Sequence, residues 1–194
     1  MTSPSVRRRV QLALTLVIAL ACGSSITSAT TPPPAAAREI GPLLRPAPCP
    51  DDIGVPVVGR TATVLPCLTD PGRLVHIRPG NGRAEVINVW ASWCEPCRRE
   101  ASLLETAYRD AGDRVLFLGI NSRDERGTAL RFLRTTAVSY PQVFDAQGTV
   151  ARRLGVAGVP YTVVVEASGE IVLRQLGELT EQALSTALAR AGIP

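Results

Sequence analysis

Apolar and polar positions follow two different periods in the part of the chain after residue 60. Short apolar runs at 84–90 and 115–120 predict buried strands. Apolar residues three and four positions apart predict helices, as they do along 94–109. In chain order, we predict a hairpin of strands 61–65 and 74–77, strand 84–90, helix 94–109, strand 115–120, a helix from 122 to about 135, an extended piece 142–144, a helix 149–154, a hairpin of strands 161–165 and 171–176, and a last helix after Thr180.

Three helix starts carry capping signals. Ser92 and Ser122 each precede a glutamate by three residues, the spacing of a capping box in which Glu95 and Glu125 would be the reciprocal partners. Thr180 is the expected cap of the last helix. Glu95 therefore has a purely structural interpretation as well as a functional one.

The alternation of strands and helices predicts an α/β fold, in which a central mixed β-sheet is flanked by helices. In such folds the chemistry lies at the carboxyl ends of the strands. The end of strand 84–90 is the predicted location of the site.

The first 48 residues have a different composition. Arg7, Arg8 and Arg9 precede an apolar stretch, 10–21, that is shorter than the roughly 20 residues of a membrane-spanning helix. We interpret 1–21 as an export signal, and the sequence around Cys22 resembles a bacterial lipobox, which predicts lipid on Cys22. Plain secretion and an uncleaved anchor are the alternatives. The Ser/Thr/Ala/Pro-rich segment 22–48 reads as a linker before a domain at 49–194.

Overall charge adds little to this interpretation. All 21 basic residues are arginine, the net charge is +4, and three of those arginines belong to the export signal. The sequence has no basic patch that indicates nucleic-acid binding.

The strongest chemical signal is Cys94-Glu95-Pro96-Cys97, at the junction of a predicted strand and a predicted helix. A thiolate at Cys94 would be favoured by the helix dipole and by free backbone N–H groups, which makes Cys94 the expected nucleophile. Cys97, one turn further on, would be shielded and would resolve the mixed disulfide. A zinc site has the same spacing but needs two more ligands, and the sole histidine, His76, has no such company. We expect no metal and no cofactor.

The remaining cysteines suggest a second bridge. With Cys22 set aside and Cys94 paired with Cys97, Cys49 and Cys67 remain to form a structural disulfide. A loop of this length would contribute roughly 3 kcal/mol in the chain-entropy model. Two unpaired thiols are the alternative.

These residues resemble the thioredoxin superfamily, in particular its TlpA/ResA-type extracytoplasmic branch. The segments that carry the resemblance are 86–100, 144–148 and 155–160. It implies a thioredoxin-like fold with a TlpA-like insertion, which 122–144 would supply, and a cis peptide bond at Val159-Pro160 beside the redox disulfide. It also implies that Glu100 exchanges a proton as Cys97 ionises, whereas the alternative is a solvated helix carboxylate.

Two further positions are interpreted through the same resemblance. Asn88 stands where thioredoxin has a buried aspartate, and an amide cannot perform acid–base chemistry. We expect Trp93 to pack beside the disulfide. Substrate is expected to contact the residues around both motifs, namely Trp93, Glu95, Pro96, Val159 and Pro160.

We therefore expect an exported, membrane-tethered thiol–disulfide oxidoreductase that acts on protein disulfides. The leading hypothesis is a reductase, with apocytochrome c as one substrate class and a membrane dithiol as electron donor. A disulfide oxidase and a non-catalytic lipoprotein are the alternatives. The motif does not decide the direction of electron flow, since about 30 mV corresponds to only about 1.4 kcal/mol. The sequence does not predict an oligomeric state.

Overall fold

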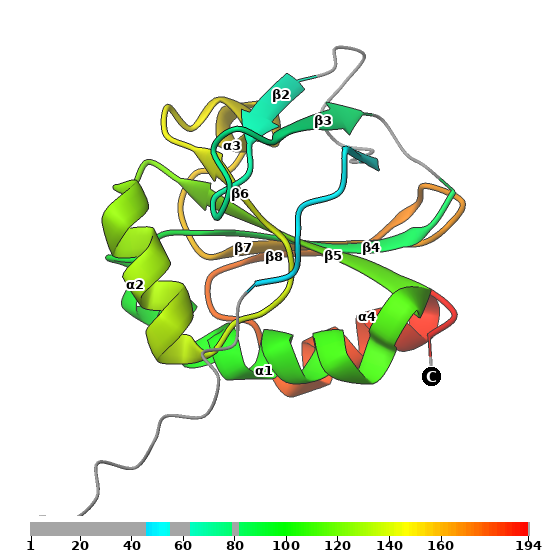
Figure 1. Ribbon diagram of the computed structural model, residues 1–194. Coiled ribbons are helices and arrows are strands. Elements are labelled where there is room, and N and C mark those ends of the chain that lie inside the picture. Colours follow the sequence, from blue (N-terminus) through cyan, green and yellow to red (C-terminus); the bar gives the residue numbers. More distant parts are fainter. Residues whose placement is uncertain (1–45, 55–62, 79–81, 194) are drawn as a thin grey trace, which may run out of the picture. The chain divides into compact units, whose positions relative to one another are not determined.

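The computed structural model describes residues 46–54, 63–78 and 82–193, which all belong to one compact unit. Within them, five strands form a sheet in the order β6-β5-β4-β7-β8 (Figure 1). These strands are β4 (Ala84–Trp90), β5 (Val115–Ser122), β6 (Gln142–Asp145), β7 (Tyr161–Val165) and β8 (Ile171–Leu176). Strands β4, β5 and β6 run parallel, while β7 and β8 are antiparallel to their neighbours. The predicted mixed sheet is confirmed.

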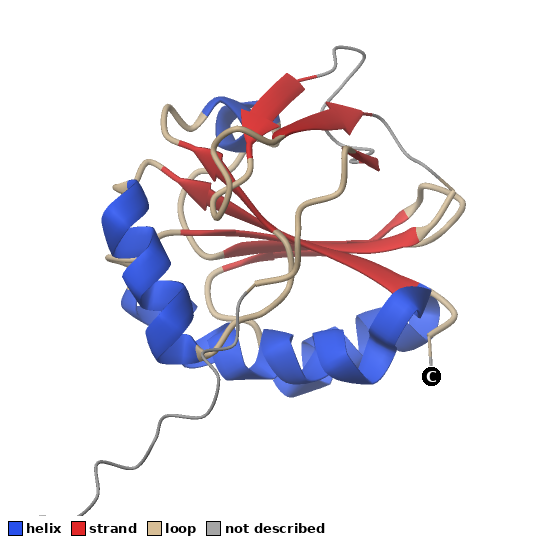
Figure 2. Ribbon diagram, in the orientation of Figure 1, coloured by secondary structure: helices blue, strands red, loops and turns tan. Residues whose placement is uncertain are grey.

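Helices cover one face of this sheet. They are α1 (Glu95–Ala111), α2 (Arg126–Thr136) and α4 (Glu181–Arg190), and Figure 2 shows them together on one side. Alternate residues of β4, including Val86 and Trp90, join buried residues of these helices, such as Leu104 and Leu184, in one apolar core. This pattern follows from the period of two along a strand.

A second, smaller sheet lies on the opposite face together with α3 (Thr149–Arg153). It consists of β1 (Asp52–Gly54), β2 (Thr63–Pro66) and β3 (Leu74–Arg78), in the order β1-β3-β2 (Figure 1). Its apolar residues join a second core that includes Ile87 and Val89 of β4. Strands β2 and β3 form the predicted hairpin, whereas the short β1 was not predicted.

Both capping-box predictions are wrong. Cys94, not Ser92, caps α1, and α2 begins after Glu125 without a side-chain cap. Ser122 is instead buried in β5. Thr180 does cap α4, since its hydroxyl accepts the N–H of Ala183 at 3.2 Å.

The predicted export signal, Cys22 and nearly all of the predicted linker lie outside the described residues. Among the residues that are described, no helix combines the length and hydrophobicity needed to cross a membrane. The same part of the chain holds no group of three or more side chains suited to bind a metal ion.

Candidate functional site

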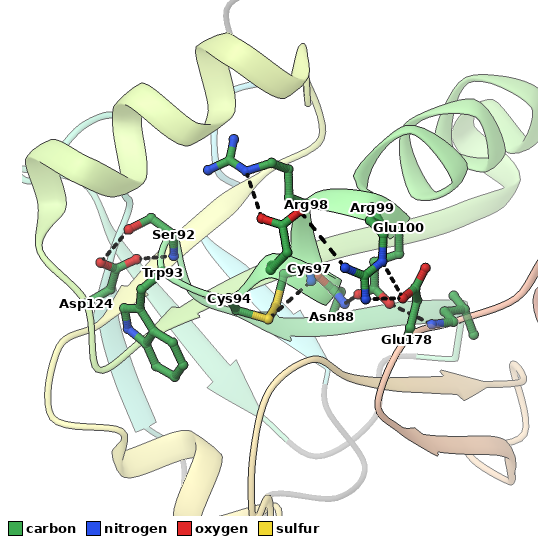
Figure 3. Close-up of a disulfide and its surroundings, with 12 residues drawn as sticks. Asn88, Ser92, Trp93, Cys94, Cys97, Arg98, Arg99, Glu100, Asp124 and Glu178 are labelled. Atoms are coloured by element: carbon green, nitrogen blue, oxygen red, sulfur yellow. Dashed lines mark hydrogen bonds and ion pairs between the residues drawn. A yellow bond between two sulfur atoms is a disulfide. The ribbon is translucent and has the colours of Figure 1, made fainter.

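A disulfide joins Cys94 to Cys97 where β4 passes into α1 (Figure 3), with a Cα–Cα distance of 5.3 Å. Cys94 is the N-cap of the helix, and its sulfur accepts the backbone N–H of Cys97 at 3.1 Å. Pro96 lies in the first turn, where a missing N–H has no cost. The helix N-terminus thus offers a hydrogen bond and a favourable dipole to negative charge on Cys94.

The two cysteines differ less in exposure than expected. Cys97 is 2% exposed, in line with a shielded resolving thiol, but Cys94 is only 4% exposed. Little of either cysteine is therefore accessible to solvent, and Cys94 is the more accessible of the two.

Glu100 lies one turn beyond Cys97 and is 2% exposed, so it is not a solvated helix carboxylate. Its Oε1 accepts a hydrogen bond from Asn88 Nδ2 at 2.9 Å, and its Oε2 accepts one from the backbone N–H of Leu179 at 2.7 Å. Burial raises the pKa of Glu100 to about 7, although both hydrogen bonds oppose the shift. A carboxyl group with this pKa can take up or release a proton near neutral pH.

Asn88 has a positioning role that its sequence context did not reveal. It lies in the middle of β4 and is buried, and its amide nitrogen donates both to Glu100 and to Thr162 Oγ1, at 3.0 Å. The Asn88 amide thus holds the Glu100 carboxylate from the side of the sheet. Thioredoxin has a buried aspartate at the position of Asn88.

Charged side chains of both signs lie on one side of the disulfide, where Figure 3 labels Arg98, Arg99 and Glu178. Arg99 Nη2 lies 2.7 Å from Glu178 Oε2, while Glu95 lies 3.8 Å from Arg98 and 4.0 Å from Arg99. All four side chains are substantially exposed, and such pairs contribute little to stability. Three of them belong to the first turns of α1, and Glu178 lies in the loop after β8.

The peptide bond between Val159 and Pro160 is cis. Pro160 is buried and its carbonyl accepts the N–H of Gly177 at 2.9 Å, while half-buried Val159 packs against the core cluster that contains both cysteines of the motif. The cis bond predicted through the resemblance is present, and part of Val159 is exposed to solvent.

Trp93 is not packed as expected. It is 66% exposed, and its indole N–H donates to the carbonyl of Arg123 at 3.2 Å. Trp90 is the buried tryptophan, stacked on Phe132 with ring centroids 4.5 Å apart and donating to Gln142 Oε1 at 2.8 Å. An exposed indole next to a reactive cysteine offers an apolar surface to a substrate.

Two buried or bonded carboxyl groups were not anticipated. Asp124, in the turn after β5, binds Ser92 of the motif loop, 32 residues away. Glu85 lies in β4 at 1% exposure, and neither of its oxygens has a hydrogen-bond partner. Only the run of apolar neighbours signalled burial at Glu85, and nothing in the sequence signalled the contact of Asp124.

A second disulfide joins Cys49 to Cys67 with a Cα–Cα distance of 5.9 Å, and both residues are 1% exposed. It ties the segment before β1 to the end of β2, close to the bridge between Cys67 and Val143 of β6. Cys49 Sγ lies 3.1 Å from the carbonyl oxygen of Gln142, and Cys67 Sγ lies 3.4 Å from Thr69 Oγ1. His76 is exposed on β3.

Comparisons with known proteins agree with this geometry. The model of a protein family described as Redoxin matches residues 54–189. The chain is 38% identical over 87 residues to the thiol:disulfide interchange protein DsbE of Allochromatium vinosum, which covers 44% of this chain and 47% of that protein. It is 30% identical over 112 residues to the thiol-disulfide oxidoreductase ResA of Halalkalibacterium halodurans, which covers 57% of this chain and 64% of that protein.

Among solved structures, a DsbF homologue from Corynebacterium diphtheriae aligns with a TM-score of 0.59 at 28% identity, over 67% of this chain and 84% of the other. The predicted thioredoxin-like fold is confirmed. The chain spans about half the length of the curated relatives it matches.

Proposed function

Because this chain belongs to the Redoxin family, we propose that it is an exported thiol–disulfide oxidoreductase that reduces disulfides in other exported proteins. The observation that carries the proposal is the Cys94–Cys97 disulfide at the start of α1, with the N–H of Cys97 directed at the sulfur of Cys94. A helix start of this kind stabilises Cys94 as a thiolate. The thiolate is the form that attacks a disulfide, and it is also the form released when the Cys94–Cys97 disulfide is reduced.

The reaction proceeds by two exchanges. The Cys94 thiolate attacks one sulfur of the substrate disulfide, which forms a mixed disulfide and releases the other substrate sulfur as a thiolate. Cys97 then loses its proton and attacks the Cys94 sulfur, which releases the second substrate thiolate. Two electrons pass to the substrate, and the enzyme is left with the Cys94–Cys97 disulfide. A membrane dithiol that is oxidised in turn restores the reduced enzyme.

Glu100 is the proposed acceptor of the Cys97 proton. It lies three residues further along α1, on the same helix face, and its pKa of about 7 lets it accept a proton at neutral pH. The same group returns a proton when the disulfide is reduced again.

Exposed surface beside the disulfide is the proposed substrate contact. Trp93 offers an apolar face, Glu95 and Pro96 lie between the cysteines, and Val159 before Pro160 offers backbone to an extended polypeptide. These features suit an unfolded protein segment around a cysteine pair, and apocytochrome c is our proposed substrate class within that group.

Trapping tests the mechanism. Cys97→Ser should accumulate a mixed disulfide through Cys94, because the attacking thiol remains and the resolving thiol is gone. Cys94→Ser is the matched control and should trap little, since the remaining thiol lies one turn deeper in the helix. The reverse pattern would make Cys97 the attacker and refute the assigned roles.

The direction of electron flow has its own test. Acid quenching of cells followed by alkylation should find the wild-type Cys94 and Cys97 mainly as thiols, because a donor keeps a reductase reduced. A pool found almost wholly as disulfide, together with oxidation of reduced client proteins, would establish an oxidase instead.

The export signal and the lipid on Cys22 remain part of the proposal. Labelled fatty acid should enter the full chain, and Cys22→Ala should abolish the labelling. Labelling that persists in the variant would refute the anchor, whereas its absence from both proteins, with release into the medium, would indicate plain secretion.

A further inference from the structure

Asp124 is the centre of a hydrogen-bond network that joins the turn after β5 to the loop before Cys94 (Figure 3). Its carboxylate lies in the turn between β5 and α2, and five donors reach it within 2.5–3.0 Å. The donors are Ser92 N–H, Ser92 Oγ, Asn121 Nδ2, Glu125 N–H and Thr128 Oγ1.

Ser92 is the point where this network reaches the redox loop. Its backbone N–H lies 2.5 Å from Asp124 Oδ2, and its hydroxyl lies 2.8 Å from Asp124 Oδ1. Two bonds from one residue to one carboxylate fix both the position and the rotation of that residue. Ser92 is two positions before Cys94, and only Trp93 lies between them.

The same turn also holds Trp93. The carbonyl of Arg123 accepts the Trp93 indole N–H at 3.2 Å, and Arg123 adopts a left-handed backbone conformation with φ of 52°. A residue other than glycine in this conformation needs support from its surroundings. The bonds to Asp124, the next residue, supply it.

From this geometry we infer that Asp124 is a positioning residue for the proposed disulfide exchange: it holds Ser92, and through Ser92 it keeps the Cys94 sulfur at the N-terminus of α1. This inference rests on the proposed function. The positioning by Asp124 has its largest effect in the reduced enzyme, because the bond from Cys94 to Cys97 then no longer holds the loop to the helix. If the loop shifts, Cys94 loses the N–H of residue 97 and its thiolate is less stable.

The substitution Asp124→Asn tests whether Asp124 positions Ser92. All five partners are donors, so an amide nitrogen in either orientation faces one backbone N–H, that of Ser92 or that of Glu125. Ser92→Ala removes one of the two bonds to the loop while it keeps the charge on Asp124. Comparing the two variants therefore separates positioning from a simple charge effect.

The measurement is the rate at which iodoacetamide alkylates residue 94 as a function of pH. All proteins carry Cys97→Ser, so Cys94 is the sole cysteine in the tryptic peptide 84–98, which mass spectrometry quantifies. At pH 7 we expect the rate to fall about threefold in Ser92→Ala and about tenfold in Asp124→Asn, in keeping with the strength of hydrogen bonds to a charged group. The double variant should be no slower than Asp124→Asn, because both act through one contact.

Glu125→Gln is the matched control, since the Glu125 side chain is exposed and adjacent to Asp124, and it should alkylate at the parent rate. The inference would be overturned if Cys94 in Asp124→Asn were alkylated within twofold of the rate in the Cys97→Ser protein that lacks this change, whatever the melting temperature of the variant. Faster alkylation in Asp124→Asn with no change in Ser92→Ala would also overturn it, as a pure charge effect. Failure of the wild-type chain to reduce any protein disulfide refutes the proposed function instead, and alkylation rates do not depend on that result.

Discussion

Asn88 Nδ2 lies 2.9 Å from Glu100 Oε1, so the strand before the redox motif and the helix after it meet in one hydrogen bond. The bond is buried, and the carboxylate also accepts the backbone N–H of Leu179 at 2.7 Å. Both oxygens of this carboxyl group thus accept hydrogen bonds from residues outside α1. This arrangement has consequences for the pH dependence of the reaction.

Glu100→Gln should remove the rise in rate that ionisation of Glu100 produces. Because the pKa of Glu100 is about 7, the carboxylate is available above that pH and protonated below it. Release of a mixed disulfide by Cys97 should therefore rise through pH 7 in the wild type. In the variant it should be slower by about a hundredfold at pH 7.5, the low end of general-base effects. Stopped-flow release of a labelled substrate thiol measures the profile.

Glu105→Gln is the control for this profile, since Glu105 is a buried glutamate of the same helix that binds Ser139 and Arg109 instead of the site. It should keep the wild-type dependence on pH even if it melts earlier. An unchanged profile in Glu100→Gln would remove Glu100 from the mechanism.

Asn88→Ala should raise the midpoint of the same profile above pH 7. The hydrogen bond from Asn88 favours the ionised carboxyl group and lowers its pKa, so its loss makes ionisation harder. Thr162→Val is the matched control, because it removes the other partner of Asn88 and leaves the bond to Glu100 in place. A midpoint that shifts equally in both variants would indicate a general loosening of the sheet.

Much of the fold could be predicted because it depends on local patterns. The bounds of β4, β7 and β8 agree with the prediction, since apolar runs and the turn before Ile171 are properties of neighbouring residues. The residue that caps α1 could not be predicted in this way. Ser92 has the sequence of a capping residue, but its hydroxyl binds Asp124, a partner that only the pairing of β4 with β5 brings near.

The site shows the same division. Cys94, Cys97 and Pro160 were identified from short motifs, and the cis bond follows the resemblance. The contact between Asn88 and Glu100 depends on the packing of α1 against β4, which no local pattern records. Glu85 belongs to a strand that was predicted to be buried, but the sequence does not show that its carboxyl group has no hydrogen-bond partner.

Glu85→Met should stabilise the protein, and by more at pH 8.5 than at pH 5. Burial raises the pKa of Glu85 from 4.5 to about 8, and its oxygens have no hydrogen-bond partners. With a folded-state pKa above the unfolded value, stability is present below pH 4.5 and is lost as pH rises through 8. The gain at pH 8.5 should exceed that at pH 5 by at least about 1 kcal/mol.

Urea unfolding at the two pH values measures this difference, with Glu170→Gln as the control because Glu170 is exposed near the end of the same sheet. That variant should unfold like the wild type at both pH values. Equal stabilisation by Glu85→Met at pH 5 and pH 8.5 would show that folding does not raise the pKa of Glu85.

The two disulfides should open in a fixed order when reductant is added slowly. Cys94–Cys97 should open first, because the N–H of Cys97 stabilises Cys94 as a leaving thiolate, whereas Cys49–Cys67 is 1% exposed at both ends and has no such donor at a helix start. Mass mapping of alkylated peptides at increasing dithiothreitol gives the order.

The double variant Cys49→Ala/Cys67→Ala should lose roughly 3 kcal/mol of unfolding free energy, from the loop that the bridge closes, and should still exchange disulfides through Cys94. Reduction of Cys49–Cys67 before Cys94–Cys97 would assign redox chemistry to the second bridge, and loss of exchange in a folded double variant would do the same.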